Sequence, residues 1–197
     1  MEAGADGIET DLRLTKDGQI VLFHDADLKH FGQSRMRVET LTLSELRSYD
    51  MGEGESIVTL DELLALSQGK IMLILEIKYD SETYQKLCEM LIPKIIDKLA
   101  WVEVSCFEDK VLECLHIAEA SIRLHKLIKE VSVLEDPDLL TKYDFISYFD
   151  IAVSLRKKVW ELGLIEQYKI IFWTVDKEDL STEKNAGLYG MMVNMIL

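Results

Sequence analysis

Residues 7–25, GIETDLRLTKDGQIVLFHD, decide the fold because they hold two short apolar runs with very little chain between them. Asp11 and His24 are separated by only twelve residues, too few for a helical crossover, so the second run must return antiparallel to the first. Between the runs, Asp17 and Gly18 suit the two positive-φ positions of a type I′ turn. The stretch therefore predicts a β-hairpin near the start of the chain.

The turn also predicts which side chains share a face of this hairpin. With Asp17 and Gly18 as a two-residue loop, Asp11 would face His24 directly. The apolar face would then hold Leu12, Leu14, Val21 and Phe23, and the polar face Glu9, Asp11 and His24. A three-residue loop with a bulge would shift this pairing, and the sequence leaves that alternative open.

Beyond the hairpin, short apolar runs alternate with amphipathic stretches of helical length. Residues 81–99 are one such stretch, with apolar side chains at spacings of three and four. The alternation predicts parallel strands covered by helices. Counting the hairpin as an extension of the first strand, we expect seven strands, which end near residues 12, 76, 105, 126, 148, 174 and 193.

Polar residues gather at the ends of these strands, as Glu76, Ser105 and Trp173 illustrate. In a parallel barrel the C-terminal ends of all strands converge on one face, where the catalytic groups of such enzymes lie. A doubly wound sheet fits the periodicity equally well but does not explain this clustering. We therefore predict an α/β fold of the TIM-barrel type, in a single domain over residues 1–197.

Composition narrows the classes of function. The 197 residues carry 36 acidic and 22 basic side chains, and the formal charge of −14 argues against a nucleic-acid or anionic-membrane partner. The longest apolar run, residues 71–75, is too short to span a bilayer, and no secretory signal is recognisable. Three cysteines without CxxC spacing indicate buried thiols in a reducing compartment. These features predict a cytoplasmic protein.

Three acids predict a metal site. Glu9 and Asp11 stand two residues apart and so project from the same face of one strand. Glu76 ends an apolar run, where burial would be costly without a partner. Mg²⁺ and Ca²⁺ take oxygen ligands from such groups, so the three acids predict a divalent-cation site. The alternative is that Glu9 and Asp11 are simply solvated.

The chain has four histidines, and one of them is close in sequence to these acids. His24 suits a general acid or base near the cation, because imidazole titrates close to neutral pH. Structural roles are expected for His30, His116 and His125.

Residues 4–28, GADGIETDLRLTKDGQIVLFHDADL, closely resemble the glycerophosphodiester phosphodiesterase family, whose signature is G-A-D-x-I-E-x-D-V-x-x-T-K-D-G followed by a strand ending in His-Asp. The similarity continues through LTLSELRSYDMG, VTLDELLAL, LEIK, SCF, FWTV and GLYGMMVN, and so covers nearly the whole chain. It implies hydrolysis of glycerophosphodiesters to glycerol 3-phosphate and an alcohol, in lipid and glycerol metabolism. It also implies that residues 26–69 form the family's small inserted segment.

By the same resemblance, individual residues take roles. The implied metal ligands are Glu9, Asp11 and Glu76, the implied catalytic residue is His24, and the implied substrate ligands are Lys78, Lys126 and Trp173. The two lysines would add positive charge at the phosphate oxygens. The histidine would protonate the departing alcohol oxygen or activate the nucleophile.

One part of the family pattern is not present in this sequence. Members begin with a strand bearing His-Arg-Gly and a Pro-Glu-Asn-Thr loop before the position of Ala3, and close with Asp and Pro where this chain has Val193-Asn194-Met195. We therefore expect a barrel that lacks its first strand and helix and is open along one seam. Self-association through this seam is the corresponding hypothesis.

Two other classes of function compete with an active phosphodiesterase. A catalytically impaired member would bind the cation and phosphodiesters without cleaving them, because one histidine cannot readily serve as both acid and base. A structural or assembly fragment would bind no ligand, and its acids would be surface charge.

Overall fold

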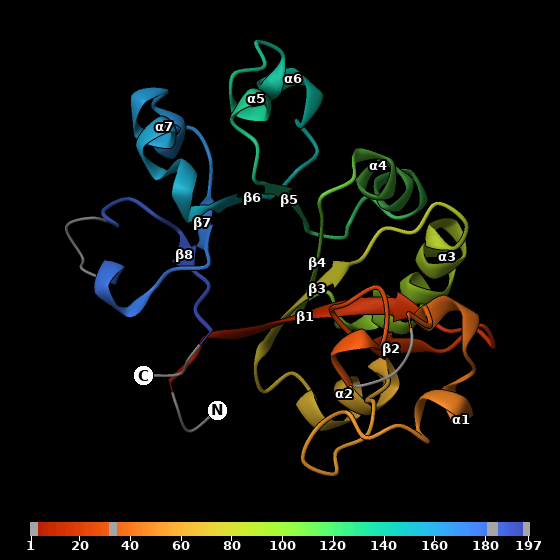
Figure 1. Cartoon of the computed structure of the whole chain (residues 1–197). Coiled ribbons are helices and arrows are strands. Elements are labelled where there is room, and N and C mark those ends of the chain that lie inside the picture. The colour runs from red at the N-terminus through yellow and green to blue at the C-terminus, as the bar shows by residue number, and fades with distance from the viewer. Residues whose placement is uncertain (1–3, 32–34, 181–184, 195–197) are drawn as a thin grey trace.

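One curled β-sheet organises the described residues, 4–31, 35–180 and 185–194, of this computed structural model (Figure 1). Its eight strands run in the order β2-β1-β3-β4-β5-β6-β7-β8, and every neighbouring pair is parallel except β1 and β2. The strands are β1 (Gly7–Leu14), β2 (Ile20–Leu22), β3 (Met72–Ile77), β4 (Val102–Cys106), β5 (Leu124–Ile128), β6 (Tyr148–Ala152), β7 (Ile170–Trp173) and β8 (Gly190–Met191). Within the described residues β8 does not pair with β1, which confirms the predicted seven-stranded barrel that is open on one side.

Helices surround the outside of this sheet (Figure 1). The α-helices are α1 (Leu43–Leu46), α2 (Leu60–Ser67), α3 (Tyr84–Ile95), α4 (Asp109–Ala118), α5 (Val131–Leu134), α6 (Leu139–Lys142) and α7 (Arg156–Glu161). Single 3₁₀ turns are η1 (Lys29–Phe31), η2 (Val38–Thr40), η3 (Ile96–Lys98), η4 (Val153–Leu155), η5 (Leu164–Glu166) and η6 (Lys177–Asp179). The helix predicted within residues 81–99 corresponds to α3 and η3.

Alternate residues of each strand divide the sheet into an outer and an inner face. Leu73, Leu75 and Ile77 of β3 are almost fully buried in the main apolar core, together with Leu87 and Leu91 of α3. Burial of each such side chain contributes roughly 1.5–3 kcal/mol to stability. The intervening residues face the barrel interior, and several of them are polar.

The interior holds a buried network of charged side chains. Nε2 of His125 lies 2.9 Å from Glu103, and Nδ1 lies 3.0 Å from Asp150. Glu103 also pairs with Arg123, and the imidazole stacks on Tyr148 with ring centroids 4.3 Å apart. Burial alone would lower the pKa of His125, but the charge of Asp150 and the hydrogen bonds to both acids raise it to about 9. A protonated His125 therefore neutralises part of the charge inside the barrel.

The hairpin of residues 7–25 forms with a register different from the one predicted. Leu12 pairs with Leu22 and Leu14 with Ile20, which leaves residues 16–18 in the loop. Among the loop residues only Gly18 has a positive φ, at 79°. The predicted two-residue type I′ turn is therefore wrong, and the three-residue alternative is correct.

The new register also changes the faces of the hairpin. The side toward the main core carries Leu12, Leu14, Ile20 and Leu22. Val21 and Phe23, predicted for this side, lie on the opposite one. His24 does not face Asp11, because the backbone N–H of Phe23 donates to the carbonyl of Asp11 at 2.9 Å.

Contacts at the hairpin tip explain the longer loop. One carboxylate oxygen of Asp17 accepts hydrogen bonds from the Thr15 hydroxyl at 2.6 Å and from the backbone N–H of Leu43 at 3.0 Å. The backbone N–H of Lys16 donates to the carbonyl of Leu41 at 2.8 Å. The tip of the hairpin therefore contacts the start of α1. A turn rule based on local sequence does not take this tertiary contact into account.

The chain between β2 and β3 packs around an apolar cluster of its own. The buried residues of this cluster are Val21 of β2 together with Leu28, Val38, Leu41, Leu46 and Ile57. A capping box between Thr42 and Glu45 begins α1. A nearly buried ion pair of 2.9 Å between Arg13 and Glu39 ties the segment to β1. That residues 26–69 form an inserted segment stays a prediction.

One strand lies later in the chain than predicted. The sequence predicts a strand ending near residue 148, whereas β6 begins at Tyr148 and ends at Ala152. Asp150 in its middle is fully buried because it pairs with His125. A buried acid interrupts the apolar pattern on which the prediction depends.

No helix within the described ranges is long and apolar enough to cross a membrane. The three cysteines are free thiols, with Cys88 and Cys106 buried and Cys114 half-buried. Burial raises the pKa of Cys106 to about 12, so this thiol stays protonated at neutral pH.

We expect His125→Gln to lower stability in a pH-dependent manner. Because the pKa of His125 rises from 6.5 to about 9 in the fold, its contribution to the free energy of unfolding is complete below pH 6.5 and is lost as the pH rises through 9. The difference between wild type and variant should fall by roughly 3 kcal/mol over that window, measured by urea denaturation. A difference that does not change with pH would mean that His125 is neutral in the folded protein.

Candidate metal centre and active site

Three carboxyl groups meet on one face of two neighbouring strands. Asp11 of β1 pairs with Glu76 of β3, and Glu9 lies two residues earlier on the same face of β1. One carboxylate oxygen from each lies within 4.8 Å of the other two. Glu76 is buried, Asp11 is half-buried, and Glu9 is exposed on a part of β1 that β2 does not cover. The structure thus brings together the three acids singled out from the sequence.

Lys78 is the counter-charge of this cluster. Its ammonium group lies 2.8 Å from Asp11 and 2.6 Å from Glu76. Its backbone N–H donates to the carbonyl of Leu12 at 3.1 Å, which fixes the chain directly after β3. Three ionised carboxylates and one ammonium leave a net charge of −2, the charge that a divalent cation neutralises.

Crowding raises the pKa of two of these acids. Partial burial, with the negative charges of Asp11 and Glu76, raises the pKa of Glu9 to about 8. Solvent at the open edge screens part of this effect, but the two neighbouring carboxylates keep its direction upward. Burial also raises the pKa of Glu76, opposed by Lys78 and, more weakly, by His24. Ionisation of all three carboxyl groups together is therefore unfavourable unless a cation joins them.

The donor set fits Mg²⁺ or Ca²⁺. Both are hard cations that bind carboxylate oxygens, and the cluster contains oxygen donors alone. Oxygens no more than 4.8 Å apart can reach one ion at ligand distances of about 2.0–2.6 Å. In the part of the chain that the structure describes, no other group of three acidic, histidine or cysteine side chains is close enough to hold an ion.

His24 lies at the end of the hairpin, near enough to Glu76 for its charge to affect the pKa of that acid. A guanidinium N–H of Arg13 donates to the carbonyl of His24 at 3.1 Å and holds its main chain. Nδ1 of the ring lies 2.8 Å from Asp25. The side chain is 72% exposed, which leaves the ring accessible to a substrate.

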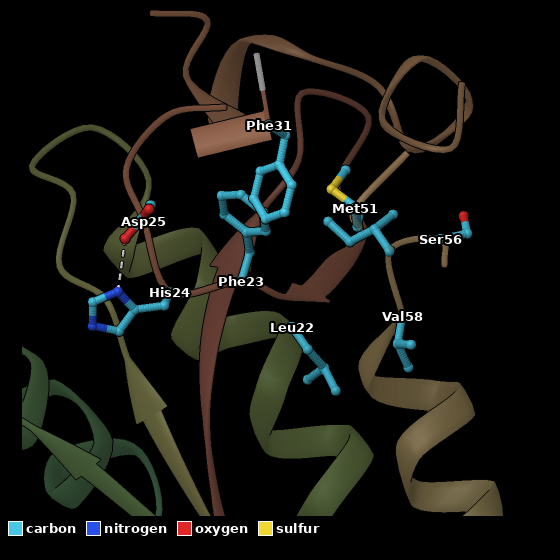
Figure 2. Close-up of a pocket in the computed structure, with 9 residues that line it drawn as sticks. Leu22, Phe23, His24, Asp25, Phe31, Met51, Ser56 and Val58 are labelled. Carbon is cyan, nitrogen blue, oxygen red and sulfur yellow. Dashed lines mark hydrogen bonds and ion pairs between the residues drawn. The ribbon is translucent and has the colours of Figure 1, made fainter. Parts of the chain in front are cut away.

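A cavity of about 330 Å³ lies between the hairpin end and the segment that follows it (Figure 2). Its mostly apolar lining comprises Leu22, Phe23, His24, Asp25, Phe31, Met51, Ser56, Ile57 and Val58. Figure 2 shows the rings of Phe23 and Phe31 packed together, whereas the imidazole of His24 points away from the apolar side chains. The accessible nitrogen of His24 is therefore turned away from this cavity.

Lys126 and Trp173, the remaining candidate substrate ligands, have other partners. Lys126 lies on the outer side of β5, 2.7 Å from Asp109 at the start of α4, and also bonds the carbonyl of Phe107. The indole N–H of Trp173 donates to the carbonyl of Asp150 at 2.9 Å, and its ring meets that of Phe107 edge-on at 5.6 Å. Within the described residues, no hydrogen bond or ion pair joins either side chain to the three acids.

Two polar residues linked to His24, Asp25 directly and His30 through Asp25, are not predicted from the sequence. Asp25 bonds Nδ1 of His24 and also Nδ1 of His30. The adjacency of His24 and Asp25 in the sequence is a usable signal, because a carboxylate commonly orients an active imidazole. The sequence gives no such signal for His30, because its contact with Asp25 depends on the turn η1. From the sequence, a structural role is expected for His30.

Comparison with other sequences identifies relatives over nearly the whole length. A model of the glycerophosphoryl diester phosphodiesterase family matches residues 1–196. The chain is 30% identical over 210 residues to a glycerophosphodiester phosphodiesterase of Caldanaerobacter subterraneus subsp. tengcongensis, covering 98% of this chain and 84% of that protein. A glycerophosphodiester phosphodiesterase of Bacillus altitudinis is 28% identical over 158 residues, 72% of this chain and 62% of that protein.

Solved structures share the fold. An Oleispira antarctica phosphodiesterase in complex with the product sn-glycerol-3-phosphate matches with a TM-score of 0.82 at 22% identity, over 98% of this chain and 82% of that one. A glycerophosphodiester phosphodiesterase from Thermotoga maritima matches with a TM-score of 0.80 at 21% identity, over 98% of this chain and 83% of that one. These similarities establish the TIM-barrel fold.

We expect Glu9→Gln to abolish cation binding and to stabilise the cation-free protein slightly. At about pH 9, above the raised pKa of Glu9, the substitution removes one of three repelling charges, a gain of about 1 kcal/mol or less because solvent screens Glu9. Excess Mg²⁺ or Ca²⁺ should raise the melting temperature of the wild type by mass action and leave that of the variant unchanged. Scanning calorimetry with chelator and with cation measures both effects.

Asp97→Asn is the matched control, because Asp97 is an exposed acid paired only with its neighbour Lys98 among the ion pairs of the described residues. It should respond to cation as the wild type does. A Glu9→Gln protein that cation still stabilises would contradict the proposed ligand set.

Proposed function

Since the chain belongs to the glycerophosphoryl diester phosphodiesterase family, we propose that it hydrolyses glycerophosphodiesters to glycerol 3-phosphate and an alcohol, with the help of a divalent cation. The observation that carries this proposal is the convergence of Glu9, Asp11 and Glu76 within 4.8 Å. The influence of His24 on Glu76 supports a proton-transferring group at the same site. The Caldanaerobacter and Oleispira relatives are themselves phosphodiesterases, which supports the same reaction class.

Each charged residue of the site has a part in this proposal. Glu9, Asp11 and Glu76 would hold Mg²⁺ or Ca²⁺, which as a Lewis acid supplies positive charge to the phosphate oxygens when bound. Lys78, already between two of the acids, opposes the rise in the pKa of Glu76 and adds positive charge at the end of β3. This arrangement would favour a phosphodiester over a neutral ester.

His24 is the residue we assign to proton transfer. Hydrolysis joins a hydroxyl group from water to phosphorus, breaks the bond from phosphorus to the alcohol oxygen, and delivers a proton to that oxygen. A protonated His24 donates this proton from Nε2, and the proton released by the attacking water restores the ring. The exposure of the ring supports this role, because the alcohol leaves toward solvent.

The remaining candidates would act at the substrate itself. The Oleispira antarctica structure contains sn-glycerol-3-phosphate, and we propose the same product here, in lipid and glycerol metabolism. Trp173 and Phe107 together would form an aromatic wall beside the glycerol. Lys126 would reach a phosphate oxygen only after leaving Asp109, so we assign it chiefly to holding the chain after β4.

Two further proposals concern the setting of the protein. Ile8 of β1 and Met191 of β8 are 43% and 39% exposed on the strands that flank the open side, which supports self-association there. Light scattering that shows only a monomer would exclude it. The three free thiols support a reducing, cytoplasmic compartment.

A catalytically impaired member is the second candidate function. The exposure of Glu9 on the open side favours it, because one ligand of the cation is then not enclosed. Such a protein would bind cation and phosphodiester without turnover.

We expect the chain with Mg²⁺ or Ca²⁺ to release glycerol 3-phosphate from glycerophosphocholine, and His24→Gln to lower kcat by about 100-fold or more. The loss should be much smaller for a p-nitrophenyl phosphodiester, whose leaving group needs no proton. His116→Gln is the control, because His116 stacks on Phe145 outside the site. Binding of glycerophosphocholine without product release would favour the impaired member instead.

A further inference from the structure

One carboxylate lies between two imidazoles at the end of the hairpin. One oxygen of Asp25 is 2.8 Å from Nδ1 of His24, and the other oxygen bonds Nδ1 of His30. The two rings are 72% and 76% exposed, whereas the Asp25 side chain is 30% exposed. Asp25 therefore bonds Nδ1 of both rings, while most of each ring is exposed to solvent.

The carboxylate decides where the protons on the rings reside. The hydrogen bond from His24 lowers the pKa of Asp25, so the carboxylate is ionised and accepts at both oxygens. Each imidazole must then donate from Nδ1. In the neutral state of His24 the lone pair lies on Nε2, which is the nitrogen available to take up and deliver a proton.

The placement of His30 follows from the packing of its own turn. His30 lies in η1, between Lys29 and Phe31, and the N–H of Phe31 donates to the carbonyl of Leu28 at 3.0 Å. Leu28 is fully buried in the apolar cluster of the segment. Phe31 packs against Phe23 with centroids 5.7 Å apart, as Figure 2 shows. Residues on both sides of His30 are thus anchored.

The contact between Phe23 and Phe31 joins η1 to the end of the hairpin, next to the two histidines. Phe23 precedes His24 and Phe31 follows His30, so the aromatic contact and the shared carboxylate connect the same two pieces of chain. The main chain of His24 is held independently, by the hydrogen bond from Arg13 to its carbonyl. Backbone and ring of His24 are therefore fixed by different partners.

We propose that Asp25 and His30 are positioning residues for His24 in phosphodiester cleavage, an inference that rests on the proposed function. Asp25 fixes the ring of His24 with its proton on Nδ1 and leaves Nε2 for the substrate. His30 binds the second oxygen of Asp25 and prevents that carboxylate from rotating away. Neither residue touches the reacting atoms, so both act through His24.

The first test is a double-mutant cycle on kcat for glycerophosphocholine. We expect Asp25→Asn to lower kcat by roughly 10- to 100-fold with little change in KM. In the His24→Gln background the same substitution should cost less than about 2-fold, because its effect passes through His24. Equal losses in the two backgrounds would overturn the proposal, since they would mean that Asp25 acts on the fold or the substrate.

Replacement of His30 gives a graded test of the second contact. An asparagine can place its amide N–H where Nδ1 of His30 stands, whereas glutamine and alanine cannot. We therefore expect His30→Asn to keep most of the wild-type kcat and His30→Gln and His30→Ala to lose about 5- to 10-fold. Equal activity of all three variants would remove His30 from the proposal.

A measurement independent of turnover separates this inference from the proposed function. Long-range ¹H–¹⁵N NMR of the imidazoles above neutral pH should find the proton of His24 on Nδ1 in the wild type and mainly on Nε2 in Asp25→Asn. If the wild type has this tautomer but cleaves no phosphodiester, the proposed function fails while the positioning by Asp25 holds. A wild-type His24 with its proton on Nε2 would overturn the positioning itself.

Discussion

The structure depends on the repulsion between three carboxylates that parallel strand pairing forces together. Because Asp11 and Glu76 are opposed in the ladder of β1 and β3, and Glu9 lies on the same face, the sheet keeps these three side chains close together. Lys78 neutralises only part of this charge. Partial burial, and then the charges of Asp11 and Glu76, raise the pKa of Glu9. A divalent cation bound by the three carboxylates would relieve their repulsion, which supports the proposed metal centre.

The hairpin extends the same strand into the second half of the site. β1 supplies Glu9 and Asp11 near its middle and Arg13 near its end, and Arg13 holds the carbonyl of His24. Arg13 also pairs with Glu39, which lies in the segment between β2 and β3. This segment therefore helps to position His24 through Arg13. The two proposed metal ligands of β1 and the proposed proton donor are therefore linked through a single strand, although they differ widely in exposure.

Features set by strand periodicity alone are the ones that the sequence predicts most reliably. A spacing of two residues and a parallel neighbour suffice to bring Glu9, Asp11 and Glu76 together. The hairpin register depends instead on Asp17 binding the start of α1, and the position of β6 depends on the ion pair of Asp150. The contact of His30 with Asp25 depends on the packing of η1. Each of these involves a tertiary contact, which no local pattern contains.

Locating a bound ion tests the proposed metal centre most directly. A crystal soaked in Mn²⁺, a stand-in for Mg²⁺ with strong anomalous scattering, should show one peak bonded to an oxygen of each of Glu9, Asp11 and Glu76 at about 2.0–2.3 Å. Lys78 should then be displaced from at least one of its two acids. A peak elsewhere, or none while Lys78 still bridges Asp11 and Glu76, would contradict the claim that these carboxylates are a metal centre.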